Sequence, residues 1–166
     1  MISDTKVVAI GGGTGLSTML KGLKLHTHNI TAVVTVADDG GSSGILRSDL
    51  GMLAPGDVRN CVSALAEVDP VMGELLNFRF KDGSLKGHSL GNLFLAALNE
   101  TSSSFDEAVK KFSHLAGVVG TVYPVTNESV TLSALLEDGR LIEGESHIGV
   151  HHDGPKNGIV KLMVNP

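Results

Sequence analysis

Cysteine, clustered positive charge and long apolar runs are all scarce in this sequence of 166 residues, and each shortage excludes a class of protein. The single cysteine, Cys61, cannot form an internal disulfide, which is typical of proteins from reducing compartments. No apolar run approaches the roughly 18 residues of a membrane-spanning helix. The start of the chain lacks the pattern of a secretory signal. We therefore expect a cytoplasmic protein without membrane insertion.

The charge pattern argues against a nucleic-acid partner. The net charge is −5 and the basic residues are scattered, whereas binding to a phosphate backbone needs clustered lysine and arginine. Hydrophobic residues make up 42% and charged residues 19% of the chain, which is the composition of an ordinary folded protein. The length predicts a single domain over residues 1–166. The oligomeric state stays open, and a homo-oligomer is compatible with the sequence.

The N-terminal region has the pattern of a βαβ unit. Lys6–Ile10 is a short β-branched run that stops at Gly11, which predicts a buried parallel strand. Ile30–Val36 predicts a second strand. Between them, apolar residues recur with the spacing of one helix face, at Leu16, Met19, Leu20 and Leu23. This order of elements indicates a right-handed crossover between parallel strands.

The middle of the chain predicts a loop followed by helices. The segment Ala37–Gly44 is rich in Asp, Gly and Ser and predicts a long polar loop. Asp57 predicts the N-cap of a helix, and another helix begins near Ser89. Ser104 and Glu107 form the capping box of a further helix.

The last third of the chain predicts β-structure. Asp138-Gly139 is the turn signal of a hairpin, and strands are predicted at 120–125, 129–136, 141–145 and 159–164. The last of these has a buried pattern and the chain stops directly after it, so we expect the natural protein to continue. The fold class that follows is α/β: a Rossmann-like three-layer fold with a mostly parallel sheet, plus a β-hairpin region in the C-terminal third.

A glycine loop between the first strand and helix predicts a phosphate site. Its residues are Gly11, Gly12, Gly13, Thr14 and Gly15. Glycines let the backbone approach a phosphate closely, and the helix N-terminus offers free N–H donors. A tight turn is the alternative interpretation, but four glycines in five residues exceed what a turn needs. The dinucleotide fingerprint would need glycine or alanine at Leu16, and the P-loop would need a Gly-Lys-Ser/Thr ending, so neither motif is met.

A second polar cluster follows the second strand, at the edge where open α/β sheets bind ligands. Asp38 and Asp39 could accept hydrogen bonds from ribose hydroxyls or hold Mg²⁺ against phosphates. Ser42 and Ser43 add hydroxyl groups beside them. A solvated Asp-Gly turn is the alternative interpretation.

Two further segments carry candidate binding residues. Arg59 and Asn60 point away from the apolar stripe of their predicted helix, so they are either solvated or directed at a ligand. His88 precedes a helix and could donate to an anion or act as an acid or base near neutrality; an exposed loop histidine is the alternative. Gly91 would be tolerated in a first helical turn if a ligand or a partner backbone must come close, and Asn92 follows it.

Two other features are interpreted as structural. His147, His151, His152 and Asp153 resemble a metal site by composition only, because the neighbouring glycines indicate a loop, and a metal site there is not favoured. Cys61 lies on the apolar stripe of its helix and is interpreted as a core residue rather than a reactive thiol.

Taken together, the segments IGGGTGLS, ADDGGSSGILR, PGDVRNC and GHSLGN resemble the CofD-like family. The similarity extends from Lys6 to the end of the chain and includes GTVYPVTNESVTLSALLEDGRLIEGES. The resemblance implies a Rossmann-like fold. One branch of the family consists of Mg²⁺-dependent 2-phospho-L-lactate transferases. The sequence is more similar to the second branch, the bacterial gluconeogenesis factors of the YvcK type, which is associated with UDP-sugar binding, carbon metabolism and cell shape.

The resemblance implies a regulatory protein that binds a UDP-sugar, rather than an enzyme; it identifies no catalytic residue and no certain cofactor, and Mg²⁺ is a possible companion of the ligand. The glycine loop would hold the diphosphate, Asp38 or Asp39 would contact ribose or Mg²⁺, and the sugar side would be lined by Arg59, Asn60, His88 and Asn92. A CofD-type transferase is the first alternative. An NAD(P)-dependent oxidoreductase is the second, and the unmet dinucleotide fingerprint weighs against it. Members of the family are longer than this chain.

Overall fold

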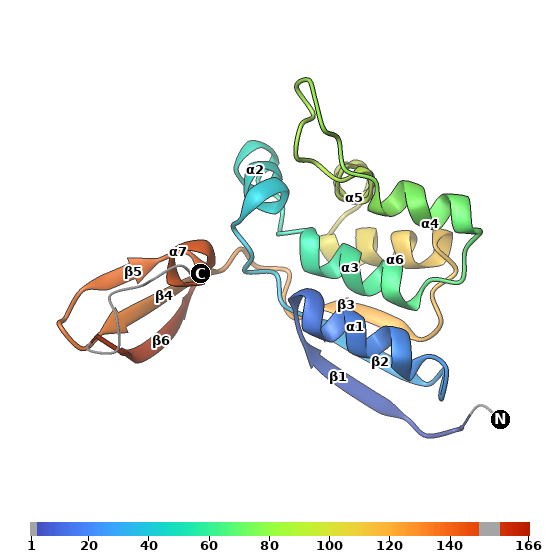
Figure 1. Cartoon of the computed structure of the whole chain (residues 1–166), viewed down its shortest axis with the longest axis horizontal. Helices are drawn as coiled ribbons and strands as arrows, with labels where there is room; N and C mark the ends of the chain where they lie inside the picture. The colour runs from blue at the N-terminus through green and yellow to red at the C-terminus, as the bar shows by residue number, and fades with distance from the viewer. Residues whose placement is uncertain (1–2, 150–156) are drawn as a thin grey trace.

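The computed structural model describes residues 3–149 and 157–166 and contains two separate sheets (Figure 1). The first sheet is parallel, in the order β1-β2-β3, with strands β1 (Val7–Gly11), β2 (Ile30–Val34) and β3 (Thr121–Pro124). β1 and β2 pair in register from Val7 with Ile30 to Gly11 with Val34. The predicted parallel sheet is therefore confirmed, and the connection between its first two strands is the helix that follows the glycine loop.

Helices cover one side of this sheet in two successive layers (Figure 1). α1 and α3 lie against it, α6 packs beside β3, and α4 and α5 lie beyond them. The helix bounds are α1 (Gly13–Leu23), α2 (Gly41–Leu50), α3 (Gly56–Leu65), α4 (Pro70–Asn77), α5 (Leu90–Glu100) and α6 (Phe105–Leu115). Ser89 and Ser104 cap α5 and α6 as predicted, because each side chain accepts from the backbone N–H three residues later.

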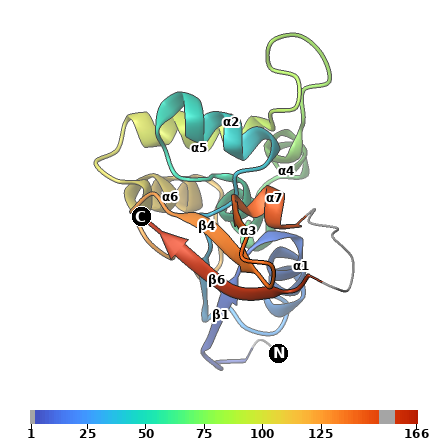
Figure 2. The ribbon, with the colours of Figure 1, turned by 90° about the vertical axis from the view of Figure 1, so that its left-hand side faces the viewer.

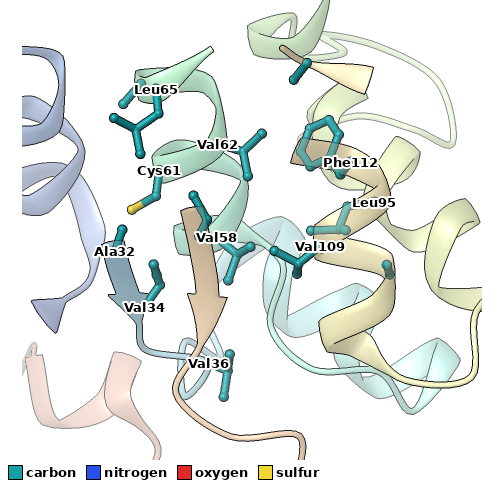
Figure 3. Packing of buried hydrophobic residues seen from close by; sticks show 14 of the residues in the cluster. Ala32, Val34, Val36, Val58, Cys61, Val62, Leu65, Leu95, Val109 and Phe112 are labelled. Atoms are coloured by element: carbon teal, nitrogen blue, oxygen red, sulfur yellow. The ribbon is translucent and has the colours of Figure 1, made fainter. Parts of the chain in front are cut away.

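The hydrophobic core is centred on α3, which lies between the sheet and α6 (Figure 3). One face of α3 is fully buried, at Val58, Cys61, Val62 and Leu65. It packs toward β2 on one side and toward Phe112 of α6 on the other. Each such aliphatic or aromatic side chain contributes about 1.5–3 kcal/mol on burial. Cys61 is thus a core residue, as the sequence pattern indicated.

The prediction that the first strand is buried on both faces is wrong in the described part of the chain. Ala9 faces the helices and is buried, whereas Val8 and Ile10 face the opposite side and are 65% and 76% exposed. The reason is that β1 is the edge strand of this sheet, and the described helices lie on only one of its faces.

The chain after β3 forms a second, antiparallel sheet that lies apart from the first in Figure 1 and faces the viewer in Figure 2. Its order is β5-β4-β6, with β4 (Thr131–Leu136), β5 (Leu141–Glu143) and β6 (Ile159–Asn165), and the short helix α7 (Glu145–Gly149) follows β5. The predicted hairpin is confirmed by the pairing of β4 with β5. The prediction that the last strand is buried is wrong, because β6 is an edge strand and its apolar side chains are exposed.

Two side chains join this sheet to the helical part. Arg47 of α2 donates to the carbonyl of Val130 and the hydroxyl of Ser129, at the entry to β4. The carboxylate of Asp39 accepts from the backbone N–H of Ser146 at 2.8 Å, at the start of α7. The C-terminal sheet is therefore held beside α2. No helix in the described ranges has the length and apolar character needed to cross a membrane.

Candidate functional site

A polar cavity of about 270 Å³ lies beyond the carboxyl end of β2, between the first turns of α2, α3 and α5. Most of its lining comes from residues that the sequence singled out: Asp38, Ser42, Ser43, Arg59, Asn60 and Asn92. Gly40, Gly41, Gly56, Asp57 and Arg79 complete it. Side chains that lie up to 54 positions apart in the sequence therefore meet at the edge where open α/β sheets bind ligands.

One wall of the cavity is formed by the start of a helix, in the segment Ala37–Gly44 that was predicted to be a polar loop. The loop prediction is wrong from Gly41 onward, because α2 begins there. Ser42 and Ser43 lie in its first turn and are buried. The first N–H groups of a helix have no partner within the helix and carry a partial positive charge. Asp, Gly and Ser are typical both of loops and of helix starts, which is why composition misled the prediction.

A buried hydrogen-bonded network connects α2, α3 and α5 behind the cavity. Asn92 donates through Nδ2 to the Ser42 hydroxyl at 3.1 Å and accepts through Oδ1 from Arg59 Nε at 3.2 Å. The Ser42 hydroxyl also lies 3.0 Å from Nδ1 of His88. His88 is only 8% exposed, so the alternative of an exposed loop histidine is excluded. The network fixes the side chains of the wall before any ligand binds.

Gly91 makes room for Arg59. A Cβ atom at Gly91 would lie 2.9 Å from the Cγ and Cδ atoms of Arg59 and 2.5 Å from the carbonyl oxygen of Leu76. The sequence predicted that a ligand or a partner backbone comes close to this glycine. In the structure the close groups are the backbone at the end of α4 and the side chain of Arg59. The stem of Arg59 crosses α5 at Gly91, and its guanidinium then reaches the cavity.

The glycine loop lies beside the cavity and is contacted by Asp57, one of the residues that line the cavity. The carboxylate of Asp57 accepts from the backbone N–H of Gly13, and a Cβ at Gly12 would collide with Thr35 and lie 2.5 Å from Asp57 Oδ2. Thr14 and Gly15 are exposed at the start of α1. At Gly12, glycine is therefore required by packing inside the protein.

Asp57 is not the N-cap of its helix, contrary to the sequence prediction. Pro55 occupies that position and α3 begins at Gly56, so Asp57 lies in the first turn and reaches across to α1. Burial raises the pKa of the Asp57 carboxyl, the hydrogen bond from Gly13 lowers it, and the nearby charge of Asp38 raises it again. The cavity thus contains two acids that repel each other, Asp38 and Asp57.

The two adjacent acids after β2 point to different places. Asp38 accepts from the backbone N–H of Gly40 at 2.9 Å and lines the cavity. Asp39 faces α7; burial raises its pKa, but hydrogen bonds from Ser146 outweigh this and lower it. The described residues contain no group of three or more His, Cys, Asp or Glu side chains with the placement of a metal site. Because their carboxylates point to different partners, Asp38 and Asp39 do not fit a shared Mg²⁺ site.

Arg79 is the cavity residue that the sequence analysis missed. It lies in the connection between α4 and α5, and its guanidinium donates to the carbonyl of Gly87. An isolated arginine in a connection carries no motif, so only the tertiary structure identifies it. Of the histidine-rich segment, His147 donates through Nδ1 to the Glu143 carbonyl at 2.8 Å, whereas His151, His152 and Asp153 lie outside the described residues.

The fold and the cavity define an α/β protein with a polar ligand site at the carboxyl edge of a parallel sheet. A sequence profile of 2-phospho-L-lactate transferase CofD matches residues 7–166. The chain therefore belongs to the CofD family, and the resemblance inferred from its motifs is confirmed.

Its similar relatives carry the name of the second branch of that family. The chain is 58% identical over 165 residues to a putative gluconeogenesis factor of Thermoanaerobacterium thermosulfurigenes, which covers 99% of this chain and 51% of the relative. It is 51% identical over 144 residues to the gluconeogenesis factor of Bacillus subtilis, covering 86% of this chain and 45% of the relative. The chain thus spans about half the length of these relatives.

A solved structure shares the fold. The crystal structure of a Bacillus halodurans protein superposes with a TM-score of 0.90 at 44% sequence identity, covering 98% of this chain and 52% of that one. A second crystal structure, also from Bacillus halodurans and described as a member of the UPF0052 family, superposes with a TM-score of 0.89.

Proposed function

We propose that this chain forms the nucleotide-binding part of a cytoplasmic regulatory protein that holds a UDP-sugar without consuming it. The observation that carries the proposal is the cavity itself: carboxylates, hydroxyls, amides and guanidinium groups line one space at the carboxyl edge of the sheet. Such groups bind the hydroxyls and phosphates of a nucleotide sugar. The proposal includes a regulatory role in carbon metabolism and in cell shape under gluconeogenic growth. The name gluconeogenesis factor, which the similar relatives carry, supports the link to carbon metabolism.

The composition of the cavity favours binding over catalysis. A catalysed step needs an acid, base or nucleophile with a pKa suited to its task. His88, the imidazole nearest to the cavity, is 8% exposed and lies against Ser42 outside the cavity lining. Asp38 and Asp57 face the ligand space, and acids there are suited to accept from sugar or ribose hydroxyls. A CofD-type phospholactate transferase that uses the same cavity is the alternative outcome of the test.

The test uses the full-length protein that contains this chain. Calorimetry with UDP-glucose and UDP-N-acetylglucosamine measures binding, and chromatography after prolonged incubation shows whether the nucleotide sugar is recovered intact. A parallel incubation with a deazaflavin acceptor and its activated phospholactate donor tests for transfer. Saturable binding with intact ligand supports the regulator. Multiple turnovers in the second mixture would favour the transferase, and no binding of either nucleotide sugar would refute the proposal.

The adjacent acids supply a matched pair of variants. Asp38→Asn removes the charge that lines the cavity, so we expect at least a tenfold loss of affinity, which corresponds to about 1.4 kcal/mol. Asp39→Asn changes the neighbouring residue in the same way, but its side chain faces Ser146, so affinity is expected to stay within about twofold, or about 0.4 kcal/mol. Equal effects of the two substitutions would show that the cavity is not the site.

A further inference from the structure

Arg59 is a buried cation without a charged hydrogen-bond partner. It is 7% exposed, and its Nε and Nη1 donate to the amide oxygens of Asn92 and Asn77 at 3.2 and 3.0 Å. The ion pairs within the described ranges are all at the surface, and none of them includes Arg59. Burying an unpaired charge costs several kcal/mol. The carboxylate of Asp57 lies near enough to raise the pKa of Arg59, but its effect is smaller than that of burial. An anion bound at the cavity would therefore compensate the rest of this cost.

A second guanidinium faces the same space. Arg79 lines the cavity together with Arg59, although the two residues belong to different elements. Burial lowers the pKa of Arg59, the positive charge of Arg79 lowers it further, and Asp57 raises it by less. Two like charges at one cavity repel each other. An anion bound between them would relieve this repulsion and would also compensate the burial of Arg59.

The first turn of α2 adds backbone donors on the same cavity. This helix has ten residues, and Gly41, Ser42 and Ser43 of its first turn all line the cavity. The start of α1 is different, because the N–H of Gly13 is already engaged by the Asp57 carboxylate. A phosphate bound at the glycine loop would meet that carboxylate. At the start of α2 a carboxylate is also present, because Asp38 accepts from the N–H of Gly40, but a phosphate there would in addition meet the two guanidinium groups of the cavity.

We propose that Arg59 and Arg79, with the first turn of α2, form the anion subsite of the cavity and hold the diphosphate of the ligand. Asp38, beside the N-cap of α2, and Asp57, beside the start of α1, then accept from the hydroxyls of the ribose or sugar. This orientation, which rests on the proposed function, is the reverse of the one that the sequence indicated. It assigns to Arg79 a role in ligand selection, since only ligands with an anionic group gain from it.

The experiment compares two probes in the full-length protein by calorimetry: UDP-glucose, and inorganic pyrophosphate, which contains the diphosphate group alone. Arg79→Gln is expected to weaken both probes at least tenfold and by similar factors. Arg79→Lys, which keeps the charge but not the planar fork, is expected to recover part of the loss. Lys86→Gln removes a positive charge from the same connection, outside the cavity lining, and is the matched control. Asp38→Asn is expected to weaken UDP-glucose but not pyrophosphate.

The outcomes separate this inference from the proposed function. Pyrophosphate binding that depends on Arg79, without any binding of UDP-glucose, would support the anion subsite and refute the nucleotide-sugar function. Binding of UDP-glucose that is equally weakened by Arg79→Gln and Lys86→Gln would overturn the subsite, because the effect would then be one of general charge. A loss confined to UDP-glucose, with pyrophosphate unchanged in Arg79→Gln, would also overturn it. Circular dichroism of each variant identifies any loss that comes from misfolding, and Arg79→Lys then provides the decisive comparison.

Discussion

Replacing Gly91 by alanine should destabilise the protein, although the same change usually stabilises a helix. Gly91 lies in the first turn of α5, where an added Cβ would be 2.5 Å from the carbonyl oxygen of Leu76 and 2.9 Å from two carbons of Arg59. The arginine stem can adjust, but the carbonyl belongs to the backbone of α4 and can move only with that helix. Gly73 of α4 is the matched control, because its Cβ would have nothing within 4 Å.

The two substitutions are expected to change the free energy of unfolding in opposite directions. Alanine gains about 0.5–1 kcal/mol over glycine inside a helix, and Gly73→Ala should show this stabilisation. At Gly91 the same gain is opposed by overpacking, which costs about 1–3 kcal/mol. The free energies of unfolding of the two variants should therefore differ by about 1–3 kcal/mol, or about 2–12 °C in Tm for a protein of this size.

Urea and thermal unfolding of the two alanine variants and the wild type measure this difference directly. Gly91→Ala should also weaken UDP-glucose binding, because the guanidinium of Arg59 is displaced with its stem, whereas Gly73→Ala should leave it unchanged. If Gly91→Ala proved as stable as Gly73→Ala, the close approach of α4, α5 and Arg59 would be incorrect, and with it the reason for a glycine at this position.

Three other predictions test the hydrophobic core, the contact of Asp57 with the glycine loop, and the contact between α2 and the C-terminal sheet. Burial raises the pKa of the Cys61 thiol to about 12, so a thiol reagent at about pH 8 should modify it only as fast as the protein unfolds; fast modification of the native protein would contradict this. Burial raises the pKa of Asp57 above its ordinary 3.8, so the native state binds the proton more tightly. The free energy of unfolding of the wild type, measured in urea relative to Asp57→Asn, should therefore fall as the pH rises from below 3.8 through the higher pKa of the native state. A free-energy difference between the two proteins that does not change with pH would refute the raised pKa of Asp57. Arg47→Gln should speed hydrogen exchange at the entry to β4, where Arg47 donates to Val130, and unchanged exchange would show that this contact is dispensable.

Local patterns in the sequence predicted the elements whose residues carry their own signals. Parallel strands were recognisable from β-branched runs, and α5 and α6 from the serine caps at Ser89 and Ser104. The hairpin was marked by Asp138-Gly139. Each of these signals lies within a few residues of the structure that it specifies, because caps and turns depend on backbone groups that are close in the chain.

The exposure of β1 and β6 could not be predicted in this way. Val8, Ile10 and the apolar residues of β6 have the composition of buried strands, yet they are exposed in the described part of the chain. Whether a strand is central or at an edge depends on which other strands pair with it, and that is a property of the whole sheet. The start of α2 could not be predicted either. Its Gly- and Ser-rich composition is typical of a loop, and it is a helix because it packs against other elements of the fold.

By itself, the sequence determined the family, the α/β class and nearly the whole set of polar residues that line the cavity, since short motifs carry these features. Only the tertiary structure decided what each residue does there. Asp38 lines the cavity while its neighbour Asp39 holds α7, and Asp57 binds the glycine loop instead of capping its own helix. Arg79 joins Arg59 from a connection that carries no motif. The direction of a side chain and the charge beside it depend on elements that are distant in the sequence, and no local pattern records which of them will meet.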